Sequence, residues 1–175
     1  ASVARCHRPA DKTAVGAHLV PALEAACGEA GVELVYETAA KQLVLTDGAV
    51  TGVVVEDKDG NEFTYAAGAV ALATGGFGSN FDMIKMYRPD LADFTTTNAP
   101  GVQGDGMVMA QAAGANLVQM DQIQIHPTVY QENGALIGEA VRGGGGILIN
   151  ANGERFTNEM GTRDVVSNAE LKQPD

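Results

Sequence analysis

Apolar residues recur at helical spacing in the first part of the chain, between residues 14 and 30. The positions that share one face of the predicted helix are Val15, Leu19, Leu23 and Ala26. Thr13 is a candidate N-cap, and Gly31 is a candidate for the left-handed residue that ends the helix. Pro21 removes one backbone hydrogen bond inside this span, so the pattern predicts a kinked helix.

The pattern then changes to alternation and short apolar runs, which are typical of strands. Five strands are predicted, over residues 32–36, 41–45, 50–56, 62–65 and 69–73. Asp-Gly pairs lie in the turns between the middle three, so these strands are expected to form an antiparallel meander. The first and last strands are short and apolar, which favours buried strands of a parallel sheet. The fold class predicted is mixed α/β.

Helices return after the strands. One is predicted over residues 79–87, with Ser79 or Asn80 as its cap, and another over 105–113, closed by Gly114. The polar loop between them is long enough that we expect it to be either functional or mobile.

The last third of the chain is expected to begin with an extended segment over residues 116–125. Residues 147–149 and 155–156 favour a hairpin around an Asn-Gly turn. A final helix is predicted to begin near residues 162–164.

Composition limits the classes of partner. The net charge is −11, so we expect no nucleic acid partner and no docking on an anionic membrane. No apolar run approaches the roughly 18–20 residues that span a bilayer, so no direct membrane insertion is expected. Cys6 and Cys27 are far apart and are expected to be free thiols, and no metal site is predicted.

The two ends of the chain look like the interior of something longer. The sequence opens on ASVARCHRP and stops at NAELKQPD, just after a charged motif. We therefore expect an internal segment of a longer enzyme. The sequence leaves the localisation open: we expect a soluble protein, and export or association with the cell envelope in the full-length protein is not excluded.

A glycine pair follows the predicted strand over residues 69–73. Thr74, Gly75 and Gly76 would place backbone N–H groups at the carboxyl edge of a sheet, where open α/β sheets bind ligands. A plain glycine turn is the alternative. The chain contains no G-x-G-x-x-G motif, so a dinucleotide would need a phosphate loop from outside it.

Residues 126–163 combine charged side chains with glycines. His126 precedes a proline and is expected in extended backbone, either as a carboxylate ligand or as an ordinary hydrogen-bonded histidine. Glu139 and Arg142 are three residues apart and would meet on a helical turn. Four glycines follow at 143–146, which argues against an ordinary surface helix with a salt bridge. The composition favours a polar site for a small carboxylate and does not name a reaction.

Several motifs, taken in order, resemble a known family. They are ALATGGFGSN, TTNAPGVQGDGMVMAQAAGA, QIHPT, GEAVRGGGGILINANGERFTNE and TRD. With the opening SVARCHRPADKTAVGAHLV they resemble the flavoprotein subunit of the fumarate reductase and succinate dehydrogenase family, in particular the soluble flavocytochrome c type. The resemblance implies the middle part of a Rossmann-type FAD-binding domain over residues 1–122. It also implies the start of a substrate-capping domain over residues 123–175.

The resemblance also implies a chemistry. The cofactor would be FAD and the substrate a small unsaturated carboxylate, with fumarate as the best single guess. By motif match, Arg163 protonates the alkene and Glu139 with Arg142 forms the relay that restores its proton. Substrate contacts match His126, Gly138 and Glu139. Contacts to FAD match Ala40, Thr74, Gly75, Gly76, Gly104 and Asp105.

One position departs from the family pattern. Gly138 stands where members that reduce fumarate commonly carry Thr or Ser, so the substrate is open. The alternatives are a related flavin enzyme (a urocanate reductase, an L-aspartate oxidase or a ketosteroid dehydrogenase) and a non-catalytic segment that binds a nucleotide or a partner. An electron-donor module is expected outside this chain, and the segment alone is expected to be inactive.

Overall fold

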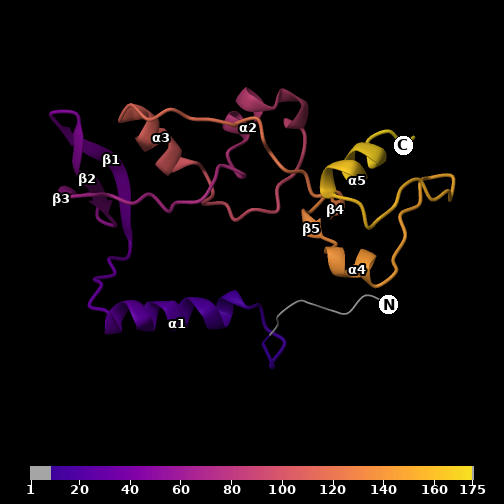
Figure 1. The fold of residues 1–175 in the computed structure, drawn as a ribbon, viewed down its shortest axis with the longest axis horizontal. Coiled ribbons are helices and arrows are strands. Elements are labelled where there is room, and N and C mark those ends of the chain that lie inside the picture. The colour runs from indigo at the N-terminus through magenta and orange to yellow at the C-terminus, as the bar shows by residue number, and fades with distance from the viewer. Residues whose placement is uncertain (1–8, 175) are drawn as a thin grey trace.

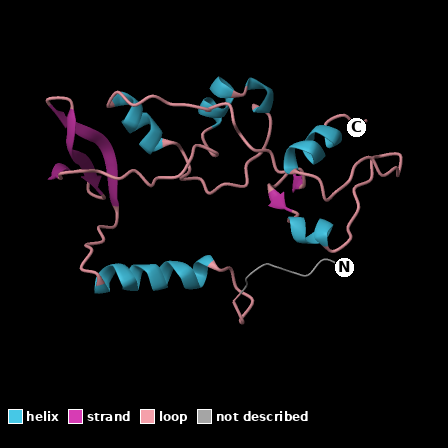
Figure 2. Ribbon diagram, in the orientation of Figure 1, coloured by secondary structure: helices cyan, strands magenta, loops and turns pink. Residues whose placement is uncertain are grey.

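The computed structural model describes residues 9–174 as helices and two small sheets (Figures 1 and 2). In chain order the elements are α1 (Gly16–Glu29), β1 (Thr38–Thr46), β2 (Ala49–Asp57), β3 (Glu62–Ala66), α2 (Phe81–Tyr87), the 3-10 helix η1 (Pro89–Leu91), α3 (Asp105–Ala112), β4 (Val129–Tyr130), β5 (Ala135–Leu136), α4 (Glu139–Gly143) and α5 (Arg163–Glu170). The predicted mixed α/β class is confirmed. Cys27 is a free thiol, and Cys6 lies outside the described residues.

The start of α1 differs from the prediction. The helix continues through Pro21 as one element, but Thr13 is not its cap. The hydroxyl and the backbone N–H of Thr13 both donate to Asp11 Oδ1, at 2.7 and 3.1 Å. The helix begins only after Val15, which provides no side-chain cap. The Thr13 hydroxyl is therefore bonded within a local turn with Asp11 and does not cap the helix.

The end of α1 agrees with the prediction. Gly31 has a φ of +75°, and its N–H donates to the carbonyl of Gly28 at 3.0 Å. The N–H of Val32 donates to the carbonyl of Cys27 at 2.9 Å, which completes the usual glycine termination of a helix. The apolar face of α1 is about half exposed, and no other described helix or strand packs on it (Figure 1): Val15, Leu19, Val20 and Leu23.

The predicted meander is confirmed. β1, β2 and β3 pair in that order, each antiparallel to the next. Asp47 and Gly48 form the two-residue turn between β1 and β2, and both have positive φ, as a hairpin turn of this kind requires. Leu43 and Val55 are buried in the sheet, and α3 packs against β1.

The predicted strands over residues 32–36 and 69–73 are wrong. Neither segment pairs with a strand among the described residues, and their side chains are largely exposed, with Leu72 at 40%. A strand requires a neighbour that supplies ladder hydrogen bonds. An apolar run indicates only that burial would be favourable, so the pattern could not show that this partner is missing.

The long polar loop is fixed against the start of α2. Asn80 is the cap, since its Oδ1 accepts from the N–H of Met83 at 3.0 Å. Its Nδ2 donates to the carbonyl of Gln103 at 2.9 Å, and Ser79 Oγ donates to the carbonyl of Ala99 at 2.8 Å. Both contacts reach across more than a dozen residues and hold the loop in one conformation.

The start of α3 depends on glycine. Gly104, rather than Asp105, occupies the N-cap position, with a left-handed φ of +86°. A Cβ at Gly104 would lie 2.9 Å from the Cβ of Phe77 and 2.9 Å from the sulfur of Met83. A Cβ at Gly106 would overlap the hydroxyl of Thr74. These two glycines let α3 approach the segment that follows residue 73.

The C-terminal part carries short elements. β4 and β5 form a two-residue hairpin that the sequence pattern did not predict. The hairpin predicted around residues 147–156 is reduced to one bridge, between Ile149 and Arg155. The side chain of Asn150 accepts from the N–H groups of Asn152 and Glu154 and so closes the turn. The predicted final helix is confirmed as α5.

Replacing Gly104 by alanine should destabilise the chain. A left-handed alanine and two contacts at 2.9 Å should together cost about 1–3 kcal/mol of unfolding free energy. Urea titration followed by circular dichroism measures this. Gly68→Ala is the matched control, because Gly68 has open space around its Cβ position and no positive φ. Equal effects of the two substitutions would contradict the close-approach account.

Candidate functional site

Glu139 is the centre of the charged cluster. Arg163 Nε donates to Glu139 Oε1 at 2.7 Å, and Arg163 Nη2 contacts the same oxygen. Arg163 Nη1 donates to Gln124 Oε1 at 2.8 Å. The guanidinium at the first position of α5 is therefore held on two sides, by α4 and by the segment that precedes His126.

His126 adds a second donor beside the same carboxylate. Its Nδ1 accepts the N–H of Thr128 at 3.2 Å, which places the ring proton on Nε2 in the neutral imidazole. Nε2 lies 3.3 Å from Glu139 Oε1, without the alignment of a hydrogen bond, and it has no hydrogen-bond partner among the described residues. The His126 side chain is 10% exposed. His126 therefore has one ring nitrogen without a hydrogen bond to the described part of the chain, in a side chain that lines a cavity.

Arg142 is the fourth residue of the cluster. It is 6% exposed, and its Nη2 lies 3.9 Å from Glu139 Oε1. The two residues lie three apart on α4, as the sequence predicted. Its Nη1 donates to the carbonyl of Glu159 at 3.1 Å. The structure therefore brings His126, Glu139, Arg142 and Arg163 together.

These surroundings keep Glu139 ionised. A hydrogen bond from its own backbone N–H and the guanidinium of Arg163 lower the pKa of Glu139 from 4.5 to about 2, with a smaller contribution from His126. Partial burial opposes the decrease. At neutral pH the cluster is one carboxylate between two guanidinium groups.

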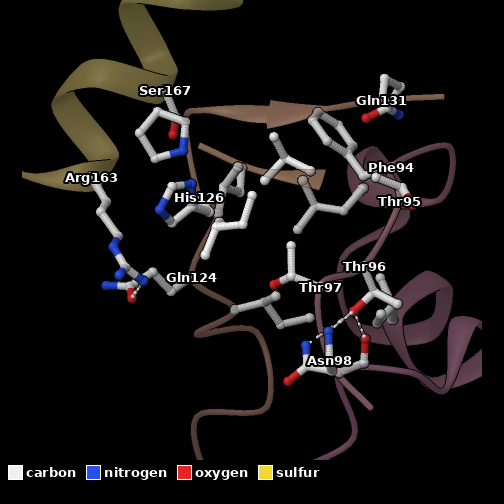
Figure 3. Close-up of a pocket in the computed structure, with 18 of the residues that line it drawn as sticks. Phe94, Thr95, Thr96, Thr97, Asn98, Gln124, His126, Gln131, Arg163 and Ser167 are labelled. Carbon is white, nitrogen blue, oxygen red and sulfur yellow. Dashed lines mark hydrogen bonds between the residues drawn. The ribbon is translucent and has the colours of Figure 1, made fainter. Parts of the chain in front are cut away.

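A cavity of about 780 Å³ opens beside the cluster (Figure 3). His126 and Arg163 line one side, and Phe94, Thr95 and Asn98 lie across from them. The hydroxyl of Ser167 is buried and has no hydrogen-bond partner within the described part of the chain. Apolar walls with a few convergent donors are typical of a small-molecule site.

A second open surface lies where α3 approaches residues 74–77. The backbone N–H groups of Thr74, Gly75 and Gly76 make no hydrogen bond within the described residues. Gly75 has a φ of +76°, with open space around its Cβ position. Gly106 lies against Thr74, so the start of α3, with Gly104 and Asp105, is adjacent to these free donors.

The two remaining predicted residues lie at less definite positions. Ala40 is exposed in β1, the strand that α3 packs against. Gly138 is the N-cap of α4, and nothing lies within 4 Å of its Cβ position. A side chain at position 138 would therefore meet open space.

Sequence patterns did not identify Gln124 or Glu159. Gln124 lies two residues before His126, so in extended backbone both side chains project to the same side. That spacing was a usable signal. Glu159 lies four residues after Arg155, but its other partners, Arg142 and Leu148, lie on separate stretches that no local spacing indicates.

Residues 2–175 match a family model described as an FAD binding domain. The chain is 40% identical over 174 residues to an NADH:fumarate oxidoreductase of Klebsiella pneumoniae, covering 99% of this chain and 19% of that protein. It is 41% identical over 174 residues to a fumarate reductase (cytochrome) of Shewanella frigidimarina, covering 99% of this chain and 30% of that protein. A urocanate reductase of Eggerthella lenta is 39% identical over 153 residues, covering 85% and 25%.

The fold agrees with this match. The open conformation of a flavocytochrome c3 fumarate reductase superposes with a TM-score of 0.76 at 40% identity, covering 97% of this chain and 30% of that chain. The chain thus spans a fifth to a third of the length of these relatives. Within residues 9–174, no helix is both long and apolar enough to cross a membrane.

The family assigns FAD as the cofactor, and the chain offers suitable groups. The free backbone N–H groups of residues 74–76 can donate hydrogen bonds to the oxygen and nitrogen acceptors of such a cofactor. Gly75 has no side chain and open space around it, so the cofactor could lie close to the backbone there. Gly78, which follows this segment, lines the cavity beside His126. A group held at residues 74–76 would therefore lie close to that cavity.

The pKa of Glu139 should depend on Arg163. In Arg163→Gln it should rise from about 2 toward 4.5 without reaching it, because the backbone N–H remains. The lowered pKa means that the ion pair stabilises the fold above about pH 4.5 and is lost as the pH falls toward 2. Carboxyl ¹³C NMR titration measures both values. The control is Glu159, whose pKa is also about 2 through Arg155 and should not move; no change at Glu139 would contradict the assignment.

Proposed function

The chain belongs to the FAD binding domain family of flavin-dependent oxidoreductases, and on this premise we propose that it contributes to a reductase of α,β-unsaturated carboxylates. The observation that carries the proposal is the cluster in which Glu139 contacts Arg163, His126 and Arg142 beside one cavity. FAD, when bound, supplies a hydride to one carbon of the substrate double bond. The residues of this chain bind the acid and deliver the proton to the other carbon.

His126 binds the substrate carboxylate. His126 lines the cavity, and its Nε2 has no hydrogen-bond partner among the described residues. A hydrogen bond to one carboxylate oxygen withdraws electron density from the conjugated double bond and stabilises the charge that develops on hydride addition. The contact from Thr128 to Nδ1 fixes the tautomer that this role requires.

Arg163 donates the proton. A guanidinium is a weak acid, with an ordinary pKa above about 12, so the donation must be coupled to rapid replacement of the proton. Glu139 lies at 2.7 Å from Arg163 Nε and is placed to return it. Once Arg163 is neutral, its positive charge no longer lowers the pKa of Glu139, and the half-exposed carboxylate takes up a proton from solvent and passes it to Arg163. Arg142 supports the relay from the buried side.

A purely binding role is less well supported. A non-catalytic nucleotide-binding segment would need the free N–H groups at residues 74–76. Such a role does not account for a carboxylate that faces two guanidinium groups and an imidazole beside a cavity. We place the boundary between an FAD-binding part and a substrate-capping part near residue 122. Electrons would come from a donor module or protein outside this chain.

The substrate is fumarate or a larger unsaturated acid. Relatives named for fumarate support the first. Gly138 supports the second, because it offers no hydroxyl to a second carboxylate and leaves open space at its Cβ position. The urocanate reductase relative is an example of an enzyme named for such an acid. Fumarate is the main proposal.

Arg163→Ala should abolish turnover in the holoenzyme that contains this chain. Loss of the proton donor should lower kcat by about 10²–10⁴-fold while FAD stays bound, since Arg163 lies outside the 74–76 and 104–106 segments. Oxidation of reduced flavin by fumarate measures kcat, and flavin absorbance measures cofactor content. Arg88→Ala is the control, as Arg88 forms its ion pair with Asp90 away from the cluster. Turnover in Arg163→Ala close to that of the control would remove Arg163 from the proposed role.

Gly138→Thr should shift the substrate preference. A hydroxyl at this position should favour fumarate over urocanate by up to about tenfold in kcat/KM, the value of one hydrogen bond. A panel of unsaturated acids with both enzymes measures the shift. Gly138→Ala separates the effect of the hydroxyl from that of added volume. A preference unchanged in both variants would show that Gly138 does not face the substrate.

A further inference from the structure

We infer that Glu159 is a positioning residue, which acts on the proton relay by holding the guanidinium of Arg142. This inference rests on the proposed function, because it assigns a task only if Arg142 serves the relay. Neither the sequence motifs nor the family match give Glu159 a role. Its side chain lies outside the cavity and contacts no group that would touch the substrate.

The carboxylate of Glu159 is buried and fully paired. It is 4% exposed and accepts from Arg155 through Nε at 3.1 Å and Nη2 at 2.6 Å. It also accepts the backbone N–H of Leu148 at 2.8 Å. Two-point pairing with an arginine and a backbone donor fixes both the position and the orientation of a carboxylate. The side chain is an anchor between residues 148 and 155.

The backbone of the same residue holds Arg142. The Glu159 carbonyl accepts from Arg142 Nη1 at 3.1 Å, and this is the one hydrogen bond that the Arg142 side chain makes within the described residues. Arg142 Nε is buried without a partner, and Nη2 reaches Glu139 only at 3.9 Å. Among the described residues, the Glu159 carbonyl is thus the hydrogen-bond acceptor that orients this buried guanidinium, in addition to its ion pair with Glu139.

The helix that carries Arg142 cannot supply this rigidity alone. α4 is five residues long and ends at Gly143. Glycines occupy positions 143–146, and one of them, Gly145, has a φ of +101°. Such backbone loses more conformational freedom on ordering than other residues do. The spacing on α4 brings Arg142 near Glu139, and the segment anchored at Glu159 then fixes the orientation of the guanidinium, whose Nη2 lies 3.9 Å from Glu139 Oε1.

Two substitutions test the anchor in the holoenzyme. Glu159→Gln keeps an acceptor for Leu148 and removes the ion pair, and Arg155→Gln removes the same pair from the other side. Each should lower kcat for fumarate about 10- to 100-fold, because a displacement of about 1 Å in a relay has that effect. KM and FAD content should stay within about twofold of the wild-type values, since no substrate or cofactor contact changes. Asp90→Asn is the matched control, as it breaks a two-point arginine pair on an exposed surface.

A double-mutant cycle separates positioning from general destabilisation. Arg142→Met should lower kcat alone, and adding Glu159→Gln should then cause no further loss, because the group that Glu159 holds is gone. A further loss of equal size on the Arg142→Met background would overturn the inference. So would an unchanged kcat in both Glu159→Gln and Arg155→Gln. An unchanged kcat in Arg142→Met would contradict the relay of the proposed function itself. A lowered kcat in Arg142→Met with an unchanged kcat in Glu159→Gln and Arg155→Gln would contradict only the role of Glu159.

Discussion

One carboxylate determines the arrangement of the charged cluster. Glu139 Oε1 faces Arg163, His126 and Arg142 at once, and these groups come from α5, from the segment before Pro127 and from α4. Without that negative charge, two guanidinium groups would be brought together without compensation, one of them buried. The attraction is therefore what draws three separate stretches of chain to one edge of the cavity.

The rest of the structure determines how well that arrangement is held. The few buried apolar residues of the described chain lie in scattered places: Leu43, Val55, Ile84, Leu91, Met109 and Val166. Specific polar contacts therefore carry much of the local order. Thr128 orients His126, Gln124 holds Arg163, and Glu159 holds Arg142. Each of these three side chains has its own supporting contact.

Local rules predicted what depends on neighbours in the sequence. The meander, the cap at Asn80, the termination at Gly31 and the pairing of Glu139 with Arg142 all follow from spacings of a few residues. Patterns failed where a distant partner decides the outcome. The apolar segments at 32–36 and 69–73 have no pairing strand within residues 9–174, and Glu159 has contacts with residues up to 17 positions away. Ordered motifs indicated which residues belong to a site, but not what holds them in place.

The net charge of the chain and the charge of the cluster beside its cavity are opposite in sign. A net charge of −11 repels an organic acid at long range, and this repulsion is screened over about 8–10 Å at physiological salt. In the cluster beside the cavity the balance reverses, because Arg163 and Arg142 outnumber Glu139 and His126 adds a further nitrogen donor. Glu170 also lines the cavity, and burial raises the pKa of its carboxyl group. Short-range donors rather than the overall field must therefore select the acid, and those donors are the same groups that would move the proton.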